Sequence, residues 1–211
     1  MRSEKEYWNE TFQKTRGEIK YDVWLDKYKE YLTEGPITII DLGCGMGNNI
    51  RYLFERGYEP VACDISDEAL KKVREYKPEC ETHCFDMREG LPFDDQTIDI
   101  LIADLSLHYF TEDRTRHVLN DIHRVLKVNG LLLCRLNSLK EITNKGEVRK
   151  TQEMYFFKNE GIYRRFFDQD EIQRFFSEDK WEHIRIEEYE LNRYTNSKML
   201  WEIAMKPRYI V

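Results

Sequence analysis

A glycine-rich loop in the first third of the chain is the feature most suited to chemistry. It reads Asp41-Leu42-Gly43-Cys44-Gly45-Met46-Gly47, between an apolar run and a segment with helical spacing. Glycines let the backbone approach a ligand closely and adopt positive φ angles, and the start of a helix offers free N–H groups to a carboxylate or phosphate. The loop therefore predicts a ligand-binding turn.

The spacing of this loop separates two classes of ligand. A dinucleotide-binding loop follows G-x-G-x-x-G, whereas this one is G-x-G-x-G, with Asn48 at the position of the third dinucleotide glycine. The carboxylate of Asp41 would be unfavourable beside a pyrophosphate and favourable beside an ammonium or sulfonium group. A nicotinamide-dependent oxidoreductase is therefore the weaker interpretation.

Acidic residues also end three later apolar runs, at Asp64, Asp86 and Asp104. In a parallel sheet these ends share one edge, which is where open α/β sheets bind ligands. Asp64 is placed to accept hydrogen bonds from a ribose diol and Asp86 from an adenine amino group, with Ile65 and Met87 on either side of the ring. The acidic rim suits a cofactor with net positive character.

A sheet of parallel strands is needed to bring these residues together, and the hydrophobic pattern predicts one. Apolar runs predict strands at 37–40, 60–63, 82–85, 98–103 and 131–136. Amphipathic segments predict helices at 48–56, 67–76 and 118–126, and Asn129-Gly130 predicts the turn that ends the last. This alternation indicates crossover connections, and hence a parallel sheet covered on both faces.

Flanking segments of different character complete a single domain of 211 residues. Residues 1–35 are aromatic and predict an N-terminal helical cap, and residues 36–137 are the cofactor-binding core. Residues 138–167 are an insertion with a locally positive charge, for which we expect a substrate lid. Residues 168–211 predict a helix capped by Asp168 and then a hairpin with strands near 181–190 and 197–206.

Composition excludes several classes of protein. The net charge of −7 disfavours general nucleic-acid binding, and no apolar run reaches the roughly 18–20 residues needed to span a bilayer. The charged N-terminus is not a secretory signal, and the odd set of five cysteines indicates reduced thiols. No second cluster completes a metal site beside Cys80, His83 and Cys84. We expect a cytoplasmic protein without a metal or a membrane partner.

The ordered motifs over residues 37–136 resemble those of the class I S-adenosylmethionine-dependent methyltransferases. The glycine loop resembles the first motif, Asp64-Ile65 the ribose site, and Asp86-Met87 the adenine site. The segment from Asp104-Leu105 to Tyr109 resembles the segment after the fourth strand that, in members of this family, faces the methyl group. Within the family, the chain is similar to small bacterial enzymes of the thiopurine and tellurite methyltransferase types.

The resemblance implies a fold and a cofactor. The fold would be a single-domain, Rossmann-like α/β fold, with a mostly parallel seven-stranded sheet, a C-terminal antiparallel hairpin and helices on both faces. The cofactor would be S-adenosylmethionine, and the product S-adenosylhomocysteine. Arg16 is a candidate partner for the methionine carboxylate of this cofactor.

Methyl transfer from a sulfonium is an in-line displacement, so the protein mainly orients the acceptor. A general base is needed only if the nucleophile carries a proton of high pKa. His108, just after the fourth strand, is the candidate base, and Tyr109 is a candidate for orienting the acceptor. A packing role is the alternative for both residues.

Candidate acceptor contacts lie mostly in the flanks; they are Trp8, Arg135, Asn137, Tyr155 and Arg165. The alternative for Arg135 and Asn137 is that they anchor the insertion. The aromatic and basic end of the insertion is typical either of a solvated loop with a few packed rings or of a lid that selects flat or anionic compounds.

The sequence leaves the acceptor open. A small molecule is the leading hypothesis, with the chain a monomer or homodimer. An RNA or protein acceptor is the alternative, because aromatic residues with interleaved arginines can stack on bases, although the net charge leans against RNA. A non-catalytic module that binds S-adenosylmethionine is the third hypothesis.

Overall fold

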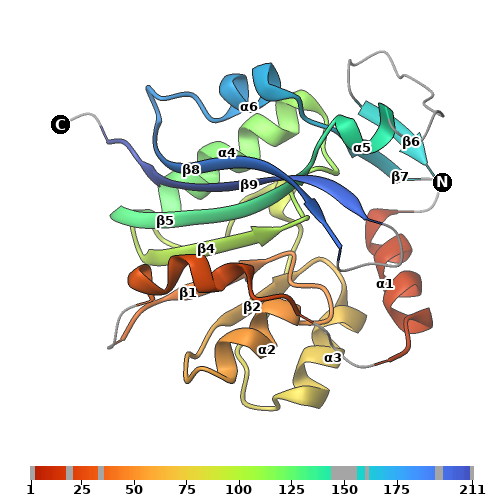
Figure 1. The fold of residues 1–211 in the computed structure, drawn as a ribbon. Helices are drawn as coiled ribbons and strands as arrows, with labels where there is room; N and C mark the ends of the chain where they lie inside the picture. The colour runs from red at the N-terminus through yellow and green to blue at the C-terminus, as the bar shows by residue number, and fades with distance from the viewer. Residues whose placement is uncertain are drawn as a thin grey trace.

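The short apolar runs of the chain form one seven-stranded sheet in the computed structural model (Figure 1). Its strands are β1 (Ile39–Leu42), β2 (Val61–Asp64), β3 (Thr82–Cys84), β4 (Ile98–Asp104), β5 (Leu126–Asn137), β8 (Trp181–Leu191) and β9 (Lys198–Pro207). They lie in the order β3-β2-β1-β4-β5-β9-β8. The residues described are 3–17, 21–32, 36–143, 156–159, 162–192 and 197–209.

The direction of the strands confirms the predicted fold class. Strands β1 to β5 pair in parallel, while β9 runs antiparallel to both β5 and β8. The predicted C-terminal hairpin is therefore present, although residues 193–196 of its connection lie outside the described residues. Parallel strands need crossovers, so the carboxyl ends of β1, β2 and β4 meet at one edge.

Helices cover both faces of the sheet, as the sequence predicted (Figure 1). They are α1 (Glu4–Lys14), η1 (Trp24–Tyr31), α2 (Asn48–Phe54), α3 (Asp67–Tyr76), η2 (Met87–Glu89), α4 (Glu112–Val125), α5 (Lys140–Thr143) and α6 (Gln169–Phe175). Side chains alternate along β5: Leu132 and Leu136 join the core under α4 and α6, whereas Leu131 and Leu133 join the core under η1. The sheet is thus buried on both sides.

The end of α4 differs from the prediction. The helix ends at Val125 and β5 begins at Leu126, so Asn129 and Gly130 lie inside the strand. The φ angle of Gly130 is outside the left-handed region, but a Cβ there would lie 2.9 Å from the backbone N and O of Lys127. A glycine is therefore needed at position 130 because the backbones of Lys127 and Ile98 approach it closely, where the register between β4 and β5 shifts. It does not form a turn.

The insertion leaves and rejoins the core at one point. Ser138 bridges to Phe167 in parallel, and the Leu139 N–H donates to the Phe167 carbonyl at 2.8 Å. Within it, β6 (Phe156–Asn159) pairs antiparallel with β7 (Ile162–Arg165). Tyr155 lies outside the described residues. None of the described helices is long and apolar enough to cross a membrane.

Candidate functional site

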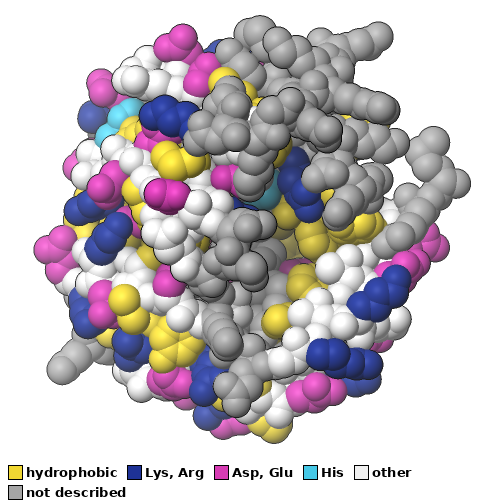
Figure 2. Space-filling view, turned by 45° about the vertical axis from the view of Figure 1, so that its right-hand side comes forward, with side chains coloured by type: hydrophobic (Ala, Val, Ile, Leu, Met, Phe, Trp, Pro, Cys, Tyr) yellow, Lys and Arg dark blue, Asp and Glu magenta, His cyan; other side chains and the backbone are white. Residues whose placement is uncertain are grey.

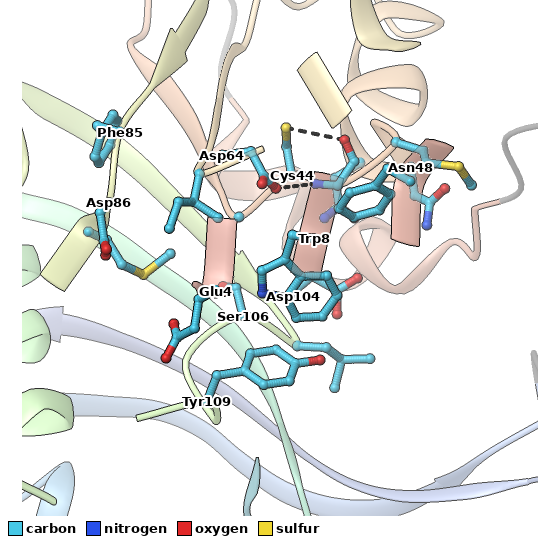
Figure 3. Close-up of a pocket in the computed structure, with 18 of the residues that line it drawn as sticks. Glu4, Trp8, Cys44, Asn48, Asp64, Phe85, Asp86, Asp104, Ser106 and Tyr109 are labelled. Atoms are coloured by element: carbon cyan, nitrogen blue, oxygen red, sulfur yellow. Dashed lines mark hydrogen bonds between the residues drawn. The ribbon is translucent and has the colours of Figure 1, made fainter. Parts of the chain in front are cut away.

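A cavity of about 240 Å³ lies at the carboxyl edge of β1, β2 and β4 (Figure 3). The predicted residues that line it are Trp8, Gly43, Cys44, Gly45, Asp64, Ile65, Asp86, Met87, Asp104, Leu105 and Tyr109. They come from α1 and from the loops that follow successive strands. The fold therefore brings together most of the predicted cofactor site.

The glycine loop forms one wall of this cavity through left-handed backbone. Gly43, Gly45 and Gly47 have φ angles of 76°, 54° and 87°. A Cβ on Gly43 would lie 2.4 Å from the Cβ of Ser106, so only glycine fits there. Gly47 does not line the cavity; it is the N-cap of α2. The loop thus packs directly against the turn after β4.

Asp64 is held in place by backbone donors. Its Oδ2 accepts from the Gly45 N–H and its Oδ1 from the Ser66 N–H, both at 2.9 Å. Burial raises the pKa of this carboxyl, although these backbone hydrogen bonds act to lower it. Each carboxylate oxygen can accept more than one hydrogen bond, so Asp64 can also accept from a ligand in the cavity.

Asp41 lies under the glycine loop rather than in the cavity wall. Its side chain is fully buried; Oδ1 accepts from Asn49 Nδ2 at 3.3 Å, and Oδ2 has no partner among the described residues. Burial raises the pKa of Asp41 to about 8, with Asp104 and Asp64 adding to the rise and the Asn49 hydrogen bond opposing it. A buried acceptor without a donor fits a cationic ligand group nearby.

Arg135 does not line the cavity. Its fully buried guanidinium donates to both oxygens of Asp104, at 2.8 and 2.7 Å, and to Asp22 at 2.7 Å. It also lies over the ring of Trp24, 4.6 Å from the centroid. The expectation of an acceptor contact, or of an anchor for the insertion, is corrected: Arg135 joins the N-terminal segment to the end of β4.

Arg165 and Asn137 are likewise buried away from the cavity. Arg165 Nη1 pairs with Glu171 Oε2 at 3.0 Å, and its guanidinium lies 5.3 Å from the ring centroid of Phe175. The backbone carbonyl of Asn137 accepts from the Phe167 N–H at 2.9 Å. The Arg165 guanidinium and the Asn137 backbone carbonyl therefore bind protein partners where the insertion returns to the core.

His108 and Tyr109 diverge although they are adjacent. Tyr109 lines the cavity, and its ring is 5.0 Å from that of Trp8. His108 is buried behind it, with no partner for Nδ1 among the described residues. Burial, together with the charges of Arg164 and Lys198, holds the pKa of His108 well below its usual range. The imidazole is therefore neutral at physiological pH, and its surroundings disfavour protonation.

Sequence reasoning missed part of the cavity wall: Glu4, Met46, Asn48, Asn49, Phe85, Ser106 and Phe110. Phe12 also lines it, and Glu4, Trp8 and Phe12 fall four residues apart on one face of α1. That spacing is readable in the sequence. Arg16 does not extend this face, because α1 ends at Lys14; Arg16 is exposed and lies outside the cavity lining.

Comparison with known proteins agrees with this geometry. Residues 40–134 match the model of a family described as a methyltransferase domain. This stretch of the chain is similar to a methyltransferase domain. This match spans β1 to the middle of β5, which is the part of the sheet that carries the glycine loop and the acidic strand ends.

Curated relatives differ in the acceptors that their names give. The tRNA N(3)-cytidine methyltransferase METTL2 of Bos taurus is 24% identical over 66% of this chain and 40% of its own length. The malonyl-[acyl-carrier protein] O-methyltransferase of Hamiltonella defensa is 30% identical over 49% of this chain and 40% of its own length. The chain therefore spans less than half the length of these relatives.

A solved structure shows the same fold over most of both chains. A protein of Methanosarcina mazei described as a SAM-dependent methyltransferase superposes with a TM-score of 0.67 and 19% identity, covering 85% of this chain and 96% of that one. At this identity the likeness concerns the fold. The Rossmann-like methyltransferase fold predicted from the sequence is confirmed, and the family match over residues 40–134 agrees with the predicted family.

Proposed function

We propose that the chain transfers a methyl group from S-adenosylmethionine to a small-molecule acceptor. The observation that carries the proposal is the cavity itself. It combines a left-handed glycine loop, a carboxylate held by two backbone N–H groups, and further carboxylates at the next strand ends. An acidic cavity suits a cofactor with an ammonium and a sulfonium better than one with phosphates.

The residues of the cavity fit such a cofactor in the predicted orientation. Asp64 would accept hydrogen bonds from the ribose diol. Asp41, buried beneath the glycine loop, would favour the ammonium group through its negative charge when ionised rather than by direct contact. The cofactor supplies a methyl group activated by its sulfonium leaving group. Asp86 and Met87 would then lie at the adenine end.

The chain's own contribution is orientation and exclusion of water. Trp8 and Phe12 stack at 5.8 Å and, with Tyr109, place aromatic rings over the cavity. Holding an acceptor in line with the methyl group can lower the barrier by several kcal/mol, so no other catalytic group is required for a thiol-like nucleophile. For a hydroxyl or amine a general base would be needed, and His108 is poorly placed for that role, because it lies outside the cavity lining and burial lowers the pKa of its imidazole.

Two features favour a small acceptor. The cavity is about 240 Å³ and is covered by α1. The net charge is −7, and the described Lys and Arg side chains of the face in Figure 2 are interspersed with Asp and Glu. Polyanions bind to concentrated basic surfaces, so this distribution supports a small molecule over RNA.

Calorimetry with S-adenosylhomocysteine tests the cofactor. We expect the wild type to bind it, and Asp64→Ala to bind it more weakly by about 1–3 kcal/mol, since hydrogen bonds to a charged acceptor are lost. Glu75→Ala, an exposed position on α3, is the matched control and should bind as the wild type does. Absence of wild-type binding at millimolar ligand would reject the proposed cofactor.

Transfer of a labelled methyl group into separated metabolite, RNA and protein fractions tests the acceptor. We expect the label in the metabolite fraction. RNA is the second candidate, because the similarity to the METTL2 relatives extends over 66% of this chain. Label in the RNA fraction would replace the small-molecule proposal, and tight cofactor binding without transfer to any fraction would favour a binding module.

A further inference from the structure

The face of α1 that points into the cavity carries a carboxylate whose role the cofactor assignments above leave open. Glu4 is the first residue of the helix and lines the cavity with Trp8 and Phe12. Its side chain is 37% exposed, and burial raises its pKa even though Arg88 acts to lower it. A partly buried carboxylate in an acidic cavity is costly unless donors satisfy it.

Arg88 joins Glu4 to the predicted adenine site. Its Nε donates to both oxygens of Asp86, at 2.8 and 3.0 Å, and its Nη2 also donates to Asp86. The remaining Nη1 reaches Glu4 Oε1 at 2.7 Å. One guanidinium therefore holds the carboxylates of α1 and of the turn after β3 together.

The two carboxylates are not equally available to a ligand. Both oxygens of Asp86 accept from Arg88, and Oδ1 accepts the Arg88 backbone N–H as well, at 3.0 Å. Glu4 uses Oε1 for Arg88, whereas no described residue donates to Oε2. Figure 3 shows Glu4 and Asp86 at the same end of the cavity, away from Asn48 at the other. A donor at this end would meet Glu4 Oε2 with its acceptor capacity intact.

The helix that carries Glu4 is positioned by polar contacts with the same part of the site. Lys5 pairs with Asp67 at 2.7 Å, and Asn9 Oδ1 accepts from the Ser66 hydroxyl at 2.7 Å. Ser66 in turn donates its backbone N–H to Asp64. The start of α1 is therefore fixed relative to the ribose and adenine positions, although the helix buries none of its own residues.

We propose that Glu4 is a further cofactor-binding residue, and that its Oε2 accepts a hydrogen bond from the exocyclic amino group of adenine. The amino group would then bind to Glu4 of the N-terminal helix beside Asp86 of the sheet edge, with Arg88 holding the two carboxylates together. The inference rests on the proposed function, because it assumes an adenosine cofactor in this cavity. Under this proposal, α1 helps to select adenine over other bases.

The test compares two ligands that differ at the 6-substituent of the purine and in the hydrogen that accompanies it on N1. S-adenosylhomocysteine carries the amino group, and S-inosylhomocysteine carries a carbonyl oxygen in its place. We expect wild-type protein to prefer the adenine ligand in calorimetry, because a carboxylate repels a carbonyl. Glu4→Gln should bind S-adenosylhomocysteine about 5–10-fold more weakly and should narrow the ratio of the two affinities at least 5-fold, since Gln can donate to the carbonyl.

Glu10→Gln is the matched control. It removes one negative charge from the same helix, at a side chain that is 46% exposed and pairs with Lys14. We expect it to leave the ratio unchanged. If Glu4→Gln weakens both ligands equally, or changes neither affinity, Glu4 does not read the base and the inference is wrong. If the wild type binds neither ligand, the proposed function itself fails, which is a distinct result.

Discussion

The molecule has two sets of charged side chains whose positions the sequence predicted unequally well: the strand-end carboxylates, and the buried arginines of β5 and β7. Asp64, Asp86 and Asp104 line the cavity, as expected from their places at the ends of strands. Arg135 and Arg165 were also expected to face a ligand, but both are buried in ion pairs with protein carboxylates. Position at a strand end therefore placed the acidic residues at the cavity, whereas Arg135 at the end of the predicted fifth strand and Arg165 in the insertion face protein carboxylates instead.

The difference has a physical cause. A carboxylate after a parallel strand reaches the sheet edge through one or two residues of backbone, so its location follows from local structure. An arginine has a long side chain whose charged end can reach partners far along the chain, such as Asp22 for Arg135. Its destination depends on which distant segment packs there.

The largest expected effect tests whether Arg135 is a structural residue that joins Asp22 to Asp104. Arg135→Met should destabilise the fold by about 3–5 kcal/mol, because it leaves the partly buried Asp104 and Asp22 without their shared cation. Urea denaturation measures the change. Lys127→Met, on the same strand but in a more exposed pair with Asp99, should cost no more than about 1 kcal/mol. A stable Arg135→Met variant that only lost affinity for the acceptor would restore the acceptor-contact role.

A second prediction concerns the contact between the glycine loop and the turn after β4. Gly43→Ala places a Cβ 2.4 Å from Ser106, so overpacking of about 1–3 kcal/mol adds to about 1–2 kcal/mol for the left-handed backbone. Gly57→Ala is the matched control: its φ angle is 84°, and a Cβ there meets nothing within 4 Å. Thermal or urea unfolding should show the larger loss for Gly43→Ala. Equal losses would mean that the two turns are not interlocked.

The third prediction is a pH dependence from Asp41, which is smaller than the other two effects over any single pH unit. Its pKa is raised by burial from its ordinary value to about 8, so its contribution to stability is complete below about pH 4 and is lost as the pH rises to about 8. Asp41→Asn removes this pH dependence. Its free energy of unfolding, relative to that of the wild type, should therefore rise by on the order of 1 kcal/mol per pH unit across that window. Urea denaturation from pH 5 to pH 8 measures the gap.

Asp67→Asn provides the control for this titration. Hydrogen bonding to Lys5 lowers the pKa of Asp67, so the contribution of Asp67 to stability is complete at any pH above its ordinary pKa. The difference in free energy of unfolding between Asp67→Asn and the wild type should therefore stay constant from pH 5 to pH 8. Parallel stability curves for the wild type and Asp41→Asn would show that the carboxyl of Asp41 is ionised throughout.

The N-terminal helix carries a cavity face that the sequence located only in part. Trp8 and Arg16 are the residues predicted there, but the helix ends at Lys14, Arg16 lies outside the cavity lining, and the cavity face begins at Glu4. Helix ends depend on capping and on what the next segment packs against. Here Ser3 caps the start, accepting from the Glu6 N–H at 3.2 Å.

The sequence by itself determined the order of strands and helices, the glycine loop and the acidic strand ends, because each depends on periodicity, backbone freedom or position within a few residues. Only the tertiary structure decided the partners of Arg135 and Arg165, the burial of His108 and the approach of Glu4 to Asp86 through Arg88. These depend on contacts between segments far apart in the chain. Such contacts are fixed by the packing of the whole fold rather than by any local pattern.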